Sequence, residues 1–438
     1  MQEIAAAIFL ITLAVIISEK LNRTTVAMAG AMAMVVTGVL DQEQALASID
    51  ANTIGLLIGM MIIVDILRRT GFFDHVAWRA TQALGGSPWR LMAGFMVFTA
   101  VASALLDNVT TLLLLAPITL SLCRSLGLDP RPFIISQVIA SNIGGTATLI
   151  GDPPNIMIGG ATGLSFMDFL VNLGPAVLVI LPLAIAWFWW RYGRDLEPSA
   201  PRPPGAALPG EALPPVNTGS GNLMRISLIV LAGTIVGFFL HGVLHVAAGT
   251  VALMGAVVLL VLSRIDPHDV LMNVEWSTIF FFIGLFVMVG GLEHSGLIEA
   301  VAEEVVNVVG GNVVLATFGL LWFAGVTSAI VDNIPAVATL IPLTFAVARL
   351  LFPDLAHLDA AAFAVQPEIT PLWWALALGA CLGGNGTLIG ASANVVGVSI
   401  AERQGRHIGF WGFTRVGLPV AVGSLVVASI YVWLRYLL

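Results

Sequence analysis

The stretch SNIGGTATLIGDPPN, residues 141–155, interrupts a chain that otherwise consists mostly of long apolar runs. Its polar side chains are hydroxyls, amides and one carboxylate, and apolar sequence flanks it on both sides. A helix cannot continue through it, because Pro154 lacks a backbone donor and the residue before a proline avoids helical dihedral angles. Gly144, Gly145 and Gly151 permit unwinding or close backbone approach. The stretch therefore predicts a helix that is broken inside an apolar region.

The composition around this break is that of a polytopic helical membrane protein. Of the 438 residues, 58% are hydrophobic and 10% are charged, whereas a soluble domain carries about a quarter charged residues. The mean hydropathy is +0.97. Runs such as 3–18, 24–40 and 416–434 are near the length that crosses about 30 Å of hydrocarbon. The first run lacks the basic start and cleavage pattern of a signal peptide, so we expect it to be a transmembrane helix.

The break recurs in the second half of the chain, together with two other segments. Three segments reappear in the same order: 52–71 as 276–296, 105–120 as 330–345, and 144–155 as 383–394. Between them, residues 197–222 are rich in Pro, Gly and Ala and predict a flexible linker. The sequence therefore predicts a first transmembrane repeat over 1–196 and a second over 223–438.

The apolar periodicity predicts an all-α fold. We expect helices at 4–19, 24–40, 53–68, 173–191, 224–240, 247–263, 277–292 and 414–434, broken segments near 133–158 and 372–400, and short arms around Asp107-Asn108 and Asp332-Asn333. If each pair of arms forms a re-entrant hairpin, each half crosses the membrane five times, and if the arms cross fully it crosses seven times. Both numbers are odd, so the two repeats have inverted topologies. We adopt five crossings, a re-entrant hairpin and an unwound helix in each repeat.

The basic residues predict how the chain is oriented. Of the 18 Lys and Arg residues, all but Arg349 and Arg435 fall on one face, which the positive-inside rule makes cytoplasmic. Arg23 belongs to that face. This arrangement predicts a multi-pass protein of the cell inner membrane, with both termini outside and the linker cytoplasmic.

Inverted repeats with helices broken at corresponding places are typical of the binding sites of secondary transporters. Irregular backbone is tolerated at membrane depth only where protein or a water-filled cavity covers it, and the alternative is an ordinary loop at the surface. We expect the substrate or ion to bind at the two helix breaks and at the two hairpin tips, Asp107-Asn108 and Asp332-Asn333. The candidate residues are Asp107, Asn108, Asn142, Gly145, Thr146, Thr148, Asp152, Asn155, Asp332, Asn333, Gly384, Asn385, Thr387 and Asn394.

Carboxylates within apolar segments are functional-site candidates because burying them is costly. Asp107 and Asp332 occupy equivalent positions and are expected to meet near the midplane, although either could also cap the helix that follows it. Asp152 has no equivalent, because Ala391 stands at the matching position. This asymmetry predicts a single coupling-ion site. Asp65 could relay protons, or it could pair with neighbouring arginines at the cytoplasmic end of its helix.

Other residue types suggest no further chemistry. Cys123 and Cys381 lie in apolar segments and are expected to pack as small hydrophobic side chains. Tryptophans near helix ends, among them Trp373-Trp374 and Trp411, predict an aromatic belt. The sequence contains no phosphate-binding loop, metal-ligand cluster or nucleophile–base pair. We therefore expect no enzyme activity, no cofactor and no nucleic-acid partner, and an ion gradient of H+ or Na+ as the driving force.

Four segments carry a resemblance to a known family: LLDNVTTLLLLAPITL, SNIGGTATLIGDPPN, VDNIPAVATLIPL and GGNGTLIGASANVVG. Together they resemble the ion transporter superfamily, and within it the branch that holds arsenite–antimonite permeases (ArsB), NhaD-type sodium/proton antiporters and the melanosomal P protein. The resemblance implies an elevator-type transporter, often a homodimer, with substrate held between two hairpin tips and two unwound helices.

The chain departs from the dicarboxylate carriers of that superfamily, which typically have Ser-Asn-Thr at the tips. Here Asp107 and Asp332 replace the serine, and Val109 and Ile334 replace the threonine. A dianion beside two carboxylates would cost several kcal/mol, so the departure favours a neutral or cationic cargo.

The leading hypothesis is proton-coupled efflux of arsenite or antimonite. In this hypothesis Asp107, Asp332 and Asp152 alternate between protonated and occupied states. The amides and hydroxyls of the site supply hydrogen bonds. The alternatives are a sodium/proton antiporter, a sodium-coupled organic anion transporter, or a channel-like or structural membrane protein without coupled transport.

Overall fold

The computed structural model describes residues 1–438 except 19, 85–86, 194–195, 197–220 and 245. Most of the predicted linker therefore lies outside the described residues. Its last two positions, 221 and 222, begin a helix instead.

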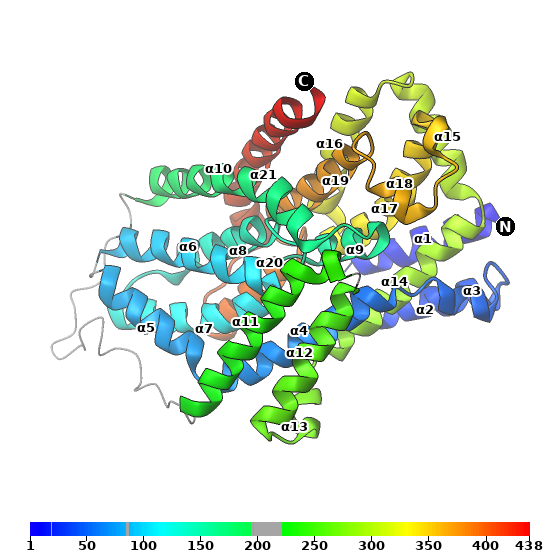
Figure 1. Ribbon diagram of the computed structural model, residues 1–438. Helices are drawn as coiled ribbons and strands as arrows, with labels where there is room; N and C mark the ends of the chain where they lie inside the picture. The colour runs from blue at the N-terminus through cyan, green and yellow to red at the C-terminus, as the bar shows by residue number, and fades with distance from the viewer. Residues whose placement is uncertain (19, 85–86, 194–195, 197–220, 245) are drawn as a thin grey trace.

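The described part of the chain is built from helices (Figure 1). In the first half these are α1 Gln2–Ile17, α2 Arg23–Val36, α3 Gln42–Ala47, α4 Ala51–Arg69, α5 Phe72–Leu84, α6 Pro88–Leu105, α7 Asn108–Leu126, α8 Pro130–Gly145, α9 Pro153–Thr162 and α10 Phe166–Tyr192. In the second half they are α11 Gly221–Leu244, α12 Ala248–Ser263, α13 Pro267–Leu271, α14 Trp276–His294, α15 Leu297–Val309, α16 Val313–Val331, α17 Asn333–Leu351, α18 Ala360–Ala364, α19 Thr370–Gly383, α20 Ser392–Arg403 and α21 Phe410–Val432. Short 3₁₀ turns lie at Pro353–Leu355 and Gly384–Gly386, and a π-helical turn at Trp433–Leu437 follows α21.

Nine helices in the described residues are long and apolar enough to cross a membrane, and α1, α2 and α12 are shorter apolar helices. The chain is therefore a multi-pass membrane protein, as its composition predicts.

The expected "short arms" are wrong in length. The helices that meet at Asp107 and at Asp332 are 18 to 19 residues long, long enough by themselves to cross a bilayer. The sequence reading also missed α5 and α15. These helices carry charged residues on one face and so lack the continuous apolar run by which the other helices were found.

The local structure is duplicated along with the sequence. Each of the helices α4, α5 and α7 has a partner, α14, α15 or α17, whose first and last residues lie 225 positions further on. Equivalent hydrogen bonds also recur. The Ser103 hydroxyl donates to the carbonyl of Ser141 at 2.7 Å, and the Ser328 hydroxyl donates to the carbonyl of Ala380 at 2.6 Å. Each bond ties a hairpin arm to a broken helix.

Two groups of helices can be followed in Figure 1. In one group α4 packs on α12, α12 packs on α11, and α2 packs on α14 and α1. In the other, α6 packs on α8 and α16 on α19, while α7 contacts α8 and α20 and α17 contacts α9 and α19. The two hairpins and the two broken helices thus form a common core.

Two of the expected belt tryptophans belong to this core. Trp373 and Trp374 are 0% and 2% exposed, and their rings lie 4.7 Å from Phe345 and 5.4 Å from Phe169. They lie near the start of α19, but protein surrounds that helix. Their position near a helix end therefore does not place them at the membrane surface. Trp411 is exposed, as a belt residue should be.

Candidate ion and substrate site

The site begins with the two helix breaks. Helix α8 ends at Gly145 and α9 begins at Pro153, and the second break lies between α19 and α20. In the first break, a Cβ on Gly145 would lie 2.4 Å from the carbonyl oxygen of Gly151. A Cβ on Gly384 would lie 2.8 Å from the carbonyl oxygen of Gly390. Each break therefore folds back on itself so closely that only glycine fits.

An asparagine holds each break in this shape. Asn155 Nδ2 donates to the carbonyls of Thr146 and Thr148 at 3.0 and 2.8 Å. Asn394 Nδ2 donates to those of Gly384 and Thr387 at 2.7 and 2.8 Å. The carbonyls freed by unwinding are thus satisfied by protein, as a membrane interior requires.

The threonines of the breaks bind the hairpin arms. The Thr148 hydroxyl donates to the carbonyl of Ala104 at 2.6 Å, and the Thr387 hydroxyl donates to that of Ala329 at 2.5 Å. The Thr146 hydroxyl donates to the carbonyl of Asn142 at 2.7 Å. In this structure these hydroxyls position the backbone of the site, whereas the sequence reading expected them to face a substrate.

The tip aspartates cap the helices that follow them, which was one of the two predicted roles. Asp107 Oδ1 accepts from the backbone N–H of Thr110 at 2.8 Å, and Asp332 Oδ1 accepts from that of Ile334 at 3.2 Å. The side chains through which both tips reach the centre are instead the neighbouring amides of Asn108 and Asn333.

Asp152 is where the two tips meet. Its Oδ1 accepts from Asn108 Nδ2 at 3.2 Å and from Asn333 Nδ2 at 3.1 Å, and the residue is 0% exposed. Among the described residues, its Oδ2 has no hydrogen-bond partner and no Lys or Arg forms an ion pair with it. A buried carboxylate without a cation is costly, and a structure that keeps one marks a functional position.

A chain of amides connects Asp152 to the second break. Asn108 Nδ2 also donates to Asn142 Oδ1 at 3.0 Å. Asn142 Nδ2 in turn donates to Asn385 Oδ1 at 2.9 Å and to Asn394 Oδ1 at 2.8 Å. Within the part of the chain that the structure describes, Asn108 Oδ1 and Asn385 Nδ2 are buried without a partner. The site therefore has both a free acceptor and a free donor beside the free carboxylate oxygen.

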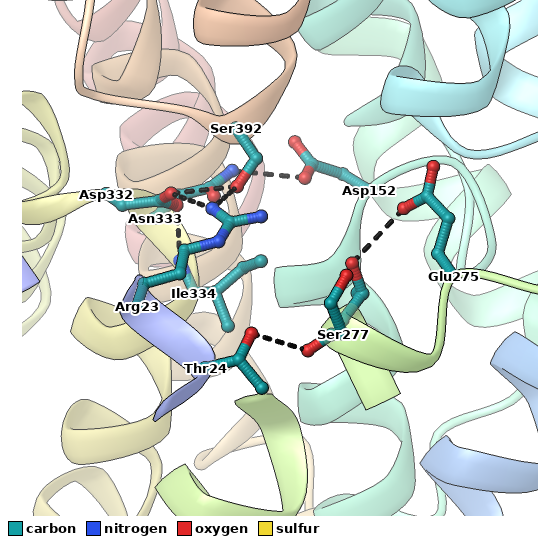
Figure 2. Close-up of polar contacts among 10 residues, drawn as sticks. Arg23, Thr24, Asp152, Glu275, Ser277, Asp332, Asn333, Ile334 and Ser392 are labelled. Carbon is teal, nitrogen blue, oxygen red and sulfur yellow. Dashed lines mark hydrogen bonds and ion pairs between the residues drawn. The ribbon is translucent and has the colours of Figure 1, made fainter. Parts of the chain in front are cut away.

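The two tips differ in charge balance, which the sequence reading did not predict. Asp332 Oδ2 lies 3.3 Å from Arg23 Nη1 and accepts from the Ser392 hydroxyl at 2.8 Å (Figure 2). Asp107 forms no ion pair within the described residues. The two carboxylates are therefore not equivalent. Arg23, assigned to the cytoplasmic surface by the positive-inside pattern, reaches the site from the start of α2.

Cys381 is a site residue that the sequence reading assigned to simple packing. Its Sγ lies 3.5 Å from Asn155 Oδ1, which places the thiol at the first break. It stands 239 residues after Asn142, the spacing that separates the two breaks. The signal was therefore present in the repeat, but the apolar flanks of the cysteine obscured it. Cys123 is buried in α7, as expected.

Asp65 lies apart from this network. It pairs with Arg68 at 2.7 Å and with Arg69 at 2.8 Å, and Asn273 Nδ2 lies 3.4 Å from its Oδ2. Of the two predicted roles, the structure therefore supports the ion pair at the end of α4.

A membrane protein with a buried, amide-lined carboxylate between two broken helices has the architecture of a secondary transporter. The chain belongs to the CitMHS citrate transporter family, whose model matches residues 13–379. It is accordingly a membrane transporter and not an enzyme. This membership confirms the resemblance carried by the Asp-Asn and Gly-Gly motifs.

Relatives cover nearly the whole chain. An uncharacterized transporter of Mycobacterium tuberculosis is 42% identical over 100% of this chain and 99% of its own length. The 46 kDa membrane protein of Mycobacterium leprae is 40% identical over the same shares. The human P protein is 34% identical over 98% of this chain, which spans 59% of the length of that relative.

The fold also resembles a solved structure. The YdaH transporter of Alcanivorax borkumensis, described as having an unusual topology, superimposes with a TM-score of 0.58. The alignment covers 90% of this chain and 86% of that one at 14% identity, so the likeness is one of fold alone.

Proposed function

We propose that the chain couples cargo movement to a cation bound at Asp152. The observation that carries this proposal is the contact set of that residue: a fully buried carboxylate held by Asn108 and Asn333, with one oxygen left without a partner. Because the two amides come from opposite tips, a cation at Asp152 would alter the interaction that joins the two hairpins. Ion binding and hairpin movement are thereby linked.

For the cargo we propose arsenite or antimonite, exported in exchange for protons. The free donor of Asn385 and the free acceptor of Asn108 suit the hydroxyl groups of a neutral trihydroxide. The charges of Asp107 and Asp332 both act on Asp152, so a multiply charged anion would meet mainly repulsion here.

Sodium/proton antiport is the second candidate. Asp152 Oδ2 and Asn108 Oδ1 are both oxygens without partners, and hard cations are bound by carboxylate and carbonyl oxygens. The third candidate, sodium-coupled transport of an organic anion such as the citrate of the family's description, is less well supported. Within the described residues of the site, the guanidinium of Arg23 is the cationic group that could meet the anion, and Asp332 already engages it.

We further propose that the halves are inverted repeats in an elevator-type transporter, with both termini outside, the linker cytoplasmic and a homodimeric assembly. The coincident helix bounds and the repeated Ser103 and Ser328 bonds support the repeat. The arms of the hairpins are long enough either to cross the membrane or to turn back within it. We propose that they turn back, as re-entrant hairpins.

Proteoliposome flux under an imposed pH gradient tests the cargo. We offer arsenite, sodium and citrate in turn, with and without a sodium gradient. Arsenite movement driven by the proton gradient is the expected result. Citrate uptake driven by sodium would contradict the argument from the acidic site, and sodium movement alone would favour antiport.

A further inference from the structure

Arg23 is the first residue of α2 and joins the body of the protein to the second hairpin tip. Its Nη1 donates to Ser392 Oγ at 2.6 Å and lies 3.3 Å from Asp332 Oδ2. The guanidinium also lies over the ring of Phe281 on α14, 5.2 Å from its centroid. Next to it, the Thr24 hydroxyl donates to a backbone carbonyl at the start of α14. The guanidinium therefore contacts Ser392 and Asp332, as Figure 2 shows, and also the ring of Phe281.

Within the described residues, the first tip has no equivalent of this arrangement. The positions that correspond to Arg23 and Ser392 by the repeat spacings are Ala248 and Pro153, neither of which has a polar side chain. The contacts of Asp107 lie within the first turn of its own helix. The two copies of the Asp-Asn motif therefore differ in charge compensation: Asp332 pairs with Arg23, whereas Asp107 forms no ion pair within the described residues.

The backbone conformation also differs between the two tip aspartates. Asp332 has φ +88°, in the left-handed region that a non-glycine residue rarely adopts, whereas Asp107 has φ −73°. Strained conformations of this kind persist where surrounding contacts over-determine them. Here the contacts with Arg23 and Ser392 hold the strained residue, so the ion pair is built into the tip.

The charge around the site is otherwise acidic. The charges of Asp107 and Asp332 both act on Asp152, and those of Asp107 and Arg23 act on Glu275 at the start of α14. Figure 2 shows the Asp152 carboxyl between the second tip and Glu275. Arg23 is thus the one cationic side chain among the described residues of this group, and it faces one particular carboxylate.

We infer that Arg23 sets the number of coupling cations, because at Asp332 it occupies the position that a monovalent cation would otherwise take. This inference rests on the proposed cation coupling and adds to it. A cation is left to bind on the side of Asp152 and Asp107, while the second tip carries its own charge compensation. Removing the guanidinium leaves Asp332 with an unpaired carboxylate in a strained, mostly buried tip, which is a position for an additional H+ or Na+.

The test is the reversal potential of transport in proteoliposomes, measured under separate sodium and proton gradients. Four proteins are compared: wild type, Arg23→Gln, Arg23→Lys and the double variant Arg23→Gln/Asp332→Asn. We expect Arg23→Gln to require one more cation per cycle than wild type. Arg23→Lys keeps the charge and the double variant removes both charges, so both should keep the wild-type stoichiometry. The gradient that moves the potential identifies the cation as H+ or Na+.

A second measurement does not need active transport. Thermal unfolding of the purified proteins is followed as NaCl is titrated and as pH is varied, because a cation that binds the folded state raises Tm by mass action. Arg23→Gln should gain a cation-dependent rise in Tm that the double variant lacks. Arg131→Gln, at an exposed ion pair with Asp129, is the matched control and should behave as wild type.

Unchanged stoichiometry in an active Arg23→Gln protein overturns the inference, as does an Arg23→Gln protein whose cation-dependent Tm matches wild type. Wild-type transport that responds to neither the sodium gradient nor the proton gradient would contradict the proposed function instead. The two failures are therefore distinguishable.

Discussion

At the scale of single residues, the two breaks share a framework and differ at five paired positions, three of which are consecutive. Asp152-Pro153-Pro154 in the first break stands where the second has Ala391-Ser392-Ala393. The first sequence places a carboxylate between the two tips. The second places a hydroxyl, that of Ser392, on Asp332. The repeat thus assigns the central carboxylate to one break and the tip contact to the other.

Cys381 provides a test of the site at this scale. Because its thiol lies 3.5 Å from Asn155 Oδ1 in the first break, alkylation by a membrane-permeant maleimide should block transport and cargo should protect against the block. Cys123, the second of the two cysteines in the chain, is the matched control. Transport by Cys381→Ser should resist the reagent and transport by Cys123→Ser should remain sensitive. Equal sensitivity of both variants would exclude Cys381 from the site.

At the scale of elements, each broken helix is fastened to a hairpin arm by equivalent threonines. Thr148→Val and Thr387→Val each remove a hydroxyl that donates a hydrogen bond to a backbone carbonyl of the hairpin arm. A lost hydrogen bond to a buried group costs about 1–3 kcal/mol. We therefore expect similar losses of stability in both variants, measured by thermal unfolding in detergent. A loss in only one of them would show that the two fastenings are not equivalent.

The positions of the helix breaks could be predicted from the sequence, for a physical reason. Pro154 and the repeated glycines forbid a continuous helix, and the breaks lie where they were expected. The contact between Arg23 and Asp332 could not be predicted, because it joins residues 309 positions apart. Charge patterns also place an arginine near a membrane face without saying where its long side chain ends.

At the scale of the whole molecule, two cavities occupy equivalent places but differ in size. One, of about 330 Å³, includes Phe286, Glu293 and Arg349 in its lining. The other, of about 60 Å³, includes Met61 and Arg68, which stand 225 positions before Phe286 and Glu293. If the repeats are inverted, as we propose, these cavities face opposite sides of the membrane, and their difference in size then makes the two sides unequal.

Cysteine accessibility tests that topology. In a Cys123→Ser/Cys381→Ser background, Phe286→Cys should react with an impermeant thiol reagent from outside, and Met61→Cys should react from the cytoplasmic side. The two positions are equivalent in the repeat, so each serves as the control for the other. Labelling of both from the same side would contradict inverted topology.

The whole account depends on Asp152 as the position of the coupling cation. The most direct measurement is gradient-driven flux by Asp152→Asn in proteoliposomes, beside Asp129→Asn at the N-cap of α8, outside the site. Hydrogen bonds to a charged group contribute about 1.5–3 kcal/mol, so we expect cation-driven flux by Asp152→Asn to fall about 10- to 100-fold. Asp129→Asn should transport as wild type does. Full cation-driven transport by Asp152→Asn would contradict the account.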